Sequence, residues 1–315
     1  MSKIIIGIHG LGNKPPKDLL EQWWKDAIIE GLKKNRYDNT DFKFELCYWA
    51  DVLHETPLNP NETDNESETY LSEPYVPFVK KGEKKEHSFR EQALEYLEKY
   101  SDKILVNGVL SFNIASLTDM FIHRHFKDLE IYYSLSFINY NGKKRLARDV
   151  IIERLTDLLK KHDKKEILLV AHSMGSIIAY DALIDYVPEI KISMLVTIGS
   201  PLAQKYVIGK INSEKNTEPE SKLPVPENIS SRWTNFYDLE DVVAINYNLA
   251  DYFTPNSDGI KIFDEEIENN YSYNEKENPH KSYGYLRADK FSNIVNSFIE
   301  EKKFNFKDWV KKIFK

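Results

Sequence analysis

The sequence has very little cysteine, no long hydrophobic run and no excess of positive charge. Its single cysteine, Cys47, excludes an internal disulfide, and because it stands in an apolar, strand-like run we expect a buried, unreactive thiol. No apolar run reaches the roughly 20 residues of a membrane span or the roughly 7 to 15 of a signal-peptide core, so we expect a cytoplasmic protein. The net charge of −7 gives no reason to expect nucleic acid as a partner.

Strand and helix patterns alternate along most of the chain. Its 315 residues can bury a core as one large domain, 1–315, without a second one. The expected strands are 3–8, 42–49, 166–171, 191–198 and 233–237. The expected helices are 15–32, 145–161, 174–186 and 291–302. This alternation predicts the α/β class, with a mostly parallel sheet and helices on both faces.

The composition changes sharply after residue 50. A polar, acidic stretch covers 59–73, and a stretch rich in apolar and aromatic residues covers 104–140, after a helical pattern at 89–100. We therefore interpret residues 51–143 as a helical insertion within the domain. It either packs on the sheet as an extra layer or covers the active site as a cap, and an apolar cap would favour an acyl chain as substrate.

Ser173 carries the strongest functional pattern in the sequence. A strand-like run ends in Ala171-His172-Ser173-Met174-Gly175, which leads into a helical pattern. A nucleophile on such a tight turn has a strained backbone, and the residues two positions either side must be small, as Ala171 and Gly175 are. The pattern resembles the nucleophile elbow of the α/β-hydrolase superfamily, G-x-S-x-G, with alanine at the first glycine. The resemblance implies a lipase- or esterase-like serine hydrolase with Ser173 as nucleophile.

A second pattern, His9-Gly10-Leu11-Gly12, follows the first strand. In the superfamily, the oxyanion of the reaction is bound by backbone N–H groups of the residue after the nucleophile and of the loop after an early strand. The resemblance therefore assigns these two positions to Met174 and Leu11. We expect the glycines at 10 and 12 to let this loop lie close to the elbow.

The resemblance also implies an order along the chain, with the nucleophile first, the acid second and the base last. His280 is the histidine beyond the acid candidates and is the expected base, whereas His172 is expected to shape the elbow. Asp241, followed by two valines, resembles the D-x-V pattern of lipase-like members and is the preferred acid. Asp238 and Glu240 are the alternatives.

Together these residues predict hydrolysis of a small-molecule or lipid ester through an acyl-enzyme. No metal or organic cofactor is implied. A thioesterase, an amidase or an acyltransferase would use the same residues, and a non-catalytic binding or effector module on the same fold is the alternative of a different class.

The C-terminal segment 302–315 places apolar side chains among six lysines. A basic amphipathic segment of this kind can make peripheral contact with an anionic membrane. Docking of its apolar side onto the chain's own domain is the interpretation that we favour.

Overall fold

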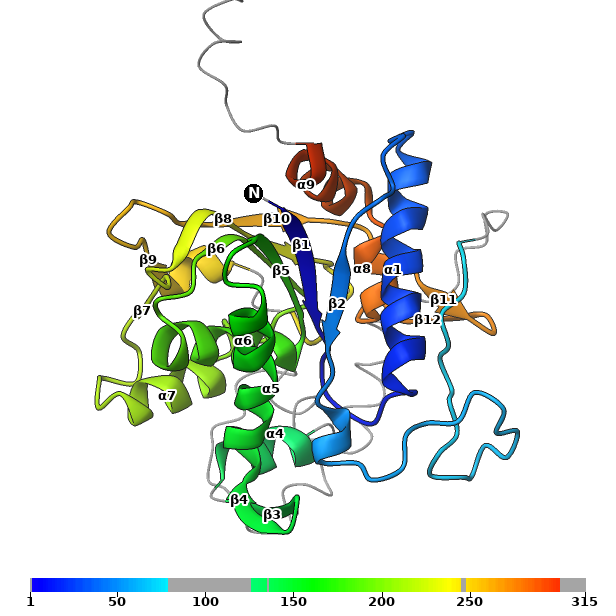
Figure 1. Ribbon diagram of the computed structural model, residues 1–315, viewed down its shortest axis with the longest axis horizontal. Coiled ribbons are helices and arrows are strands. Elements are labelled where there is room, and N and C mark those ends of the chain that lie inside the picture. Colours follow the sequence, from blue (N-terminus) through cyan, green and yellow to red (C-terminus); the bar gives the residue numbers. More distant parts are fainter. Residues whose placement is uncertain (1, 79–125, 135, 245–247, 301–315) are drawn as a thin grey trace, which may run out of the picture.

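In a computed structural model, the protein folds around a six-stranded parallel sheet (Figure 1). The structure describes residues 2–78, 126–134, 136–244 and 248–300. The strands lie in the order β10-β8-β6-β5-β1-β2, and each neighbouring pair is parallel. Their bounds are β1 Lys3–Ile8, β2 Phe44–Cys47, β5 Glu166–His172, β6 Ile192–Ile198, β8 Ile229–Tyr237 and β10 Ile262–Glu266. The predicted α/β class with a parallel sheet is confirmed.

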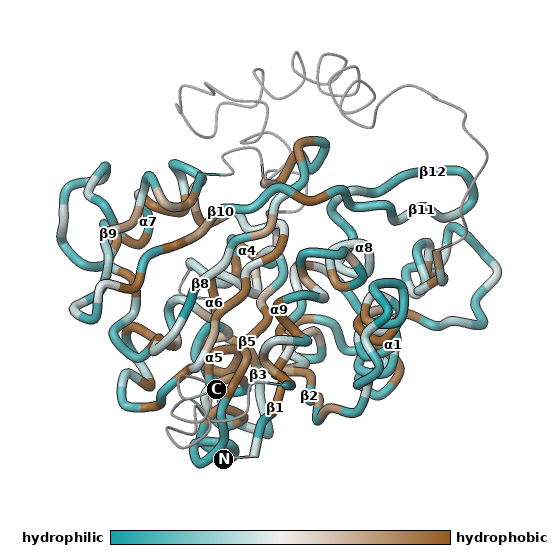
Figure 2. The backbone as a smooth tube through the Cα atoms, turned by 90° about the horizontal axis from the view of Figure 1, so that it is seen from above, coloured by the Kyte–Doolittle hydropathy of each residue, from teal (hydrophilic) through white to brown (hydrophobic). Residues whose placement is uncertain are grey.

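The central strands β1 and β5 are buried on both faces because nearly every residue in them is apolar. In β1, Ile4 and Ile6 pack in one core cluster and Ile5 packs in the other, on the opposite face. Leu169 and Leu168 divide in the same way in β5. Burial on both faces is typical of the inner strands of a parallel sheet. These strands form a hydrophobic centre beneath more polar outer segments (Figure 2).

Helices cover both faces of the sheet, as expected (Figure 1). One face is covered by α1 Lys17–Lys34, α8 Ser282–Leu286 and α9 Asp289–Glu300. The other is covered by α4 Phe126–Tyr133, α5 Ala147–Lys161, α6 Met174–Asp181 and α7 Lys205–Glu214. A π-helical turn, Ala182–Tyr186, continues α6. Within the described residues, no helix combines the length and the apolarity needed to cross a bilayer.

Smaller elements connect these layers. Antiparallel pairs are formed by β3 with β4 and by β11 with β12, and a parallel pair is formed by β7 with β9. Their bounds are β3 Phe137–Tyr140, β4 Lys143–Leu146, β7 Leu223–Pro224, β9 Phe253–Thr254, β11 Ser272–Tyr273 and β12 Lys276–Glu277. The short helices are η1 Ala50–Val52 and η4 Leu249–Tyr252.

Several predicted boundaries are wrong, and one strand was not predicted. The helix expected from residue 145 begins at Ala147, because the residues before it pair with β3. The helix expected at 291–302 is α9, Asp289–Glu300. Strand β10 was missed because three of its five residues are acidic, which is unusual in strands. It lies at the edge of the sheet, where charged side chains reach solvent.

Only part of the expected insertion, 51–143, can be compared with the structure. Residues 79–125, with the expected helix 89–100 and most of the aromatic stretch, lie outside the described residues, so the cap remains a prediction. The described part contains α4, which packs against α5, and most of the β3–β4 pair. Segment 302–315 also lies outside the described residues, so its membrane contact or docking stays a prediction.

Candidate active site

Ser173 forms the turn between β5 and α6. Its backbone has φ 53° and ψ −129°, a conformation that residues other than glycine rarely adopt. Its N–H donates to the carbonyl of Ile198 at the end of β6, at 3.1 Å. Its carbonyl accepts the hydroxyl of Ser176 at 2.6 Å. The strained turn is therefore fixed to the neighbouring strand and to the first turn of α6.

The small residues around this turn are required by close backbone contacts. A Cβ on Gly175 would lie 2.7 Å from the carbonyl oxygen of Ile8, and a Cβ on Gly10 would lie 2.6 Å from Cβ of Ser173. The expected proximity of the loop to the elbow is thus confirmed at Gly10. Gly12 differs, because a Cβ added there would come near Lys14 Nζ alone, at 3.8 Å. At this position glycine is needed for the positive φ of 80°.

His280 lies between Ser173 and Asp241. Its Nε2 is 3.0 Å from Oγ of Ser173, and its Nδ1 is 3.0 and 2.9 Å from the two carboxylate oxygens of Asp241. An ionised carboxylate only accepts hydrogen bonds, so Nδ1 carries the proton and Nε2 accepts the serine hydroxyl. The structure thus brings the three predicted residues together at the carboxyl ends of the parallel strands, although they come from three separate loops.

The two aspartates near residue 240 have different environments. Asp241 has no exposed surface, and besides His280 it accepts the N–H of Val243 at 2.9 Å and the hydroxyl of Tyr285 at 2.7 Å. The structure places this carboxylate, the preferred candidate, against the imidazole.

Asp238, the alternative acid, instead fixes the backbone around it. Its carboxylate accepts the N–H groups of Glu240 at 2.7 Å and of Asn269 at 2.5 Å. Burial raises the pKa of Asp238 to about 6 despite these bonds. The side chain therefore ties the turn after β8 to the segment that precedes His280.

Buried side chains hold three successive carbonyls in the loop of His280. The amide of Asn269 donates to the carbonyls of Pro279 and Lys281, at 2.6 and 2.8 Å. His172 lies 2.8 Å from the carbonyl of His280 and donates to it through Nε2. Burial and the nearby His280 hold the pKa of His172 well below its usual range, so it stays neutral. His172 thus supports the loop of the expected base, beyond its expected place at the elbow.

A carboxylate from the segment after β2 holds the same loop from outside. Glu73 accepts the amide of Asn278 at 2.8 and 3.0 Å and the ammonium of Lys281 at 3.0 Å. Burial acts to raise the pKa of Glu73, but these partners hold it below its usual value. An ionised Glu73 therefore stabilises the loop next to the imidazole.

The two predicted oxyanion donors have free backbone N–H groups in the part of the chain that the structure describes. There, neither the N–H of Leu11 nor that of Met174 donates to a protein acceptor. Met174 is the first residue of α6, where helix N–H groups have no partner in the helix. Both groups are therefore available to a bound anion.

His9, the first residue of the second pattern, is a structural residue. Its Nε2 accepts the N–H of Trp49 at 3.0 Å, its ring stacks on the indole, and its Nδ1 donates to the carbonyl of Gly10 at 2.9 Å. Burial lowers the pKa of His9 to about 3, so the ring is neutral. It fixes the carbonyl of the peptide group whose N–H belongs to Leu11.

Five supporting residues were missed from the sequence: Lys14, Glu73, Asp128, Asn269 and Tyr285. Tyr285 could have been suspected, because it lies on the helical segment immediately after His280. Lys14 could also have been suspected, because it follows the expected oxyanion loop by two residues. Glu73, Asp128 and Asn269 lie in segments whose position next to the site follows only from the fold.

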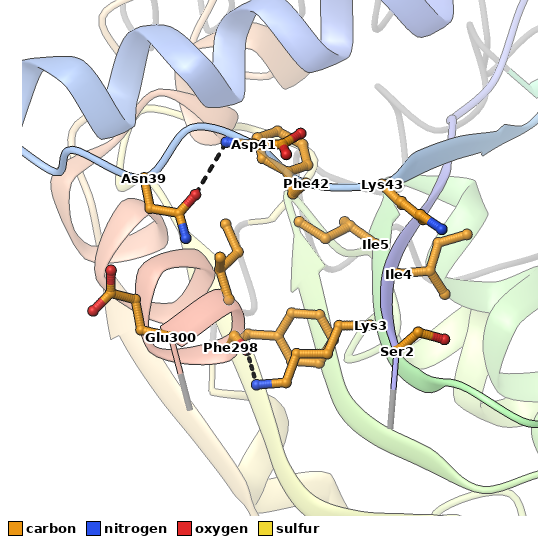
Figure 3. A pocket seen from close by; sticks show the side chains of 11 residues that line it. Ser2, Lys3, Ile4, Ile5, Asn39, Asp41, Phe42, Lys43, Phe298 and Glu300 are labelled. Carbon is orange, nitrogen blue, oxygen red and sulfur yellow. Dashed lines mark hydrogen bonds between the residues drawn. The ribbon is translucent and has the colours of Figure 1, made fainter. Parts of the chain in front are cut away.

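A pocket at the opposite end of the sheet is separate from this site (Figure 3). Its lining includes Ser2 and Ile4 at the amino end of β1, together with Phe42 and Phe298. Because β1 and β5 are parallel, and Ser173 follows the carboxyl end of β5, the pocket and the serine lie at opposite ends of the strands.

Comparison with known proteins agrees with this fold. Residues 143–277 match the family model of the PGAP1-like alpha/beta domain. The matched segment contains Ser173 and Asp241 but neither His280 nor Leu11. No curated protein matches the chain. The parallel sheet and the turn at Ser173 give the chain an α/β-hydrolase-type fold, in which residues 143–277 are similar to the PGAP1-like alpha/beta domain.

Proposed function

We propose that the protein is a serine hydrolase that cleaves a carboxylic ester through an acyl-enzyme. Ser173 is the nucleophile, His280 the base and Asp241 the acid. The observation that carries this proposal is the continuous hydrogen-bond chain from Asp241 through His280 to Oγ of Ser173, with bonds of 2.9 to 3.0 Å. A buried carboxylate orients the imidazole and stabilises its protonated form, which activates a serine that is otherwise a weak nucleophile.

In the first half-reaction, Oγ of Ser173 attacks the ester carbonyl while Nε2 of His280 takes its proton. The negative charge that develops on the carbonyl oxygen is bound by the N–H groups of Leu11 and Met174. Collapse of this intermediate breaks the bond to the alcohol, which leaves with the proton from His280. The product is an ester between the acyl group and Ser173.

In the second half-reaction, water replaces the alcohol. His280 takes a proton from the water as it attacks the acyl-enzyme, and then returns it to Oγ of Ser173. The carboxylic acid is released. The same residues would serve a thioesterase, an amidase or, with an alcohol in place of water, an acyltransferase. Identification of the products with ester, thioester and amide substrates distinguishes these reactions.

The proposal is tested by labelling the purified protein with a fluorophosphonate probe, which reacts with an activated serine. Wild type, Ser173→Ala and His280→Ala are compared, and Ser231→Ala, an exposed serine on β8, is the matched control. The same proteins are assayed with p-nitrophenyl esters of increasing chain length. We expect wild type and the control to label and hydrolyse, and both active-site variants to lose at least about 10³-fold in kcat.

Labelling that persists in Ser173→Ala would show that another residue is the nucleophile. A wild-type protein that neither labels nor hydrolyses an ester would favour the binding or effector module instead.

A further inference from the structure

The peptide group between Leu11 and Gly12 is held at both ends by charged side chains. Its N–H, on Gly12, donates to Oδ2 of Asp128 at 2.7 Å. Its carbonyl, on Leu11, accepts the ammonium of Lys14, which also donates to the carbonyl of Gly12 at 3.0 Å. Because a peptide group is planar, two such contacts fix its rotation.

This peptide group adjoins the one that carries the Leu11 N–H, across the Leu11 Cα. The preceding peptide group, which carries that N–H, is held at its carbonyl by His9 at 2.9 Å. The peptide groups on both sides of the Leu11 Cα are therefore fixed. Gly12, which has a φ of 80°, carries no Cβ to restrict its backbone, so the contacts with Asp128 and Lys14 decide the geometry.

The environment of Asp128 favours an ionised carboxylate, which is a strong acceptor for the Gly12 N–H. Its side chain is almost fully buried, and His54 lies 3.3 Å from the same Oδ2. Burial acts to raise the pKa of Asp128, but His54 and the Gly12 N–H hold it below its usual value. The carboxylate is ionised at neutral pH, and a hydrogen bond to an ionised acceptor is stronger than one between neutral groups.

We propose that Asp128 is a positioning residue for the oxyanion hole, and that Lys14 is its counterpart on the other side of the same peptide group. This inference rests on the proposed function. Asp128 does not contact the reacting atoms; it acts through the backbone of Leu11 and Gly12.

Asp128 belongs to the expected insertion, 51–143, and would link this segment to the oxyanion hole. Asp128 lies on α4 (Figure 1) and is 116 residues from Gly12. Helix α4 is itself anchored, because the hydroxyl of Tyr132 donates to the buried carboxylate of Asp181 at 2.7 Å. Helix α4, in the described part of the expected insertion, therefore supports the proposed oxyanion hole.

The test compares Asp128→Ala with Glu130→Ala, an exposed carboxylate on the same helix, and with Asp128→Asn. The asparagine keeps an oxygen that can accept the Gly12 N–H. Values of kcat and KM are measured with p-nitrophenyl butyrate, and thermal unfolding is recorded for each protein. We expect Asp128→Ala to lose about 10- to 100-fold in kcat, less than deletion of an oxyanion donor, with KM nearly unchanged. Asp128→Asn is expected to recover most of this loss.

The outcomes separate the inference from the proposed function. An active wild type with equal kcat in Asp128→Ala and Glu130→Ala would overturn the inference alone. A change confined to KM would also overturn it, because it would indicate contact with substrate. If Asp128→Ala does not fold, the inference is tested by Asp128→Asn alone. Its oxygen can still accept the Gly12 N–H, so its kcat should stay close to that of Glu130→Ala. A kcat below one tenth of the Glu130→Ala value would overturn the inference. An inactive wild type would remove the proposed function, and the inference with it.

Discussion

At the scale of single residues, Tyr285 connects the two aspartates near residue 240. Its hydroxyl donates to Oδ2 of Asp241 at 2.7 Å and accepts the backbone N–H of Asp238 at 3.1 Å. Both bonds are buried. The same short segment thus supplies the proposed base, His280, and the group that orients the proposed acid.

Tyr285→Phe should therefore lower activity without preventing folding. Loss of one hydrogen bond to Asp241 is expected to reduce kcat/KM by about 10-fold, with KM little changed. The unpaired N–H of Asp238 should also lower the free energy of unfolding by ~1–2 kcal/mol. Ester hydrolysis and urea unfolding measure the two effects. Tyr37→Phe, which removes a more exposed hydroxyl, is the control, and an equal effect in both variants would contradict the assigned role.

Lys14 should give the stability of the protein a distinctive pH dependence. Burial and the nearby Lys281 lower its pKa to about 7, against the opposite effect of Asp128 and Glu73. Between about pH 7 and pH 10 the folded protein then binds fewer protons at this residue than the unfolded chain does, so its contribution to stability rises with pH.

Wild type should consequently gain stability relative to Lys14→Met when the pH is raised from about 7 to about 9.5. Urea unfolding at several pH values measures the difference between the two proteins. Exposed Lys17→Met is the control for loss of a lysine. A difference that stays constant across the range would show that the Lys14 ammonium is not disfavoured in the fold.

At the scale of elements, the sequence predicted best where local pattern and tertiary contacts agree. The apolar runs of β1 and β5 and the small residues around Ser173 follow from local sterics, so these elements and the turn could be predicted. The edge strand β10 could not be predicted, because its acidic side chains lie partly in solvent and so lack the apolar pattern of a buried strand. The loop of His280 could not be predicted in detail, since its contact with Asn269 follows from the tertiary structure and not from a local pattern.

The contact between Gly284 and Asn269 gives an element-scale prediction. A Cβ on Gly284 would lie 1.5 Å from Oδ1 of Asn269, so Gly284→Ala must displace the amide that holds the loop of His280. We expect a loss of about 10- to 100-fold in kcat although alanine favours helices by about 1 kcal/mol. Ester hydrolysis measures the loss, and Asn269→Ala should show a similar one.

The double variant and a second glycine test this explanation. Gly284→Ala should cost no further activity in the Asn269→Ala background, because the colliding side chain is gone. Gly209→Ala on α7, where a Cβ meets nothing within 4 Å, should instead raise stability by ~0.5–1 kcal/mol. Additive losses in the double variant would contradict the collision as the cause.

At the scale of the whole molecule, an ionic network centred on the buried Asp181 joins four helices on one face of the sheet. The carboxylate of Asp181 on α6 accepts bonds from Tyr132 on α4 and Arg148 on α5, at 2.7 and 2.8 Å. Arg148 also binds Glu214 on α7 at 2.6 Å. Burial raises the pKa of Asp181 to about 6, although Arg148 and Tyr132 act to lower it. Through these bonds, α4 is connected to α5, α6 and α7.

Arg148→Met should leave Asp181 buried without a cation and destabilise the protein by ~3–5 kcal/mol at about pH 7.5. Protonation of Asp181 removes this unpaired charge, so the deficit should shrink as the pH falls towards about 5. Urea unfolding at the two pH values measures it. Addition of Asp181→Asn should restore part of the stability, and a double variant as unstable as the sum of the single variants would contradict the network.

The order in which the site residues occur in the chain has a consequence during synthesis. Ser173 precedes His280 by 107 residues, and Leu11 comes earlier still. A ribosome therefore completes the proposed nucleophile and its turn long before it makes the proposed base, so the growing chain carries Ser173 without the imidazole that would take its proton. The proposed hydrolysis requires the loop of His280 to have emerged and packed beside the sheet, so turnover would report complete folding of the newly made protein.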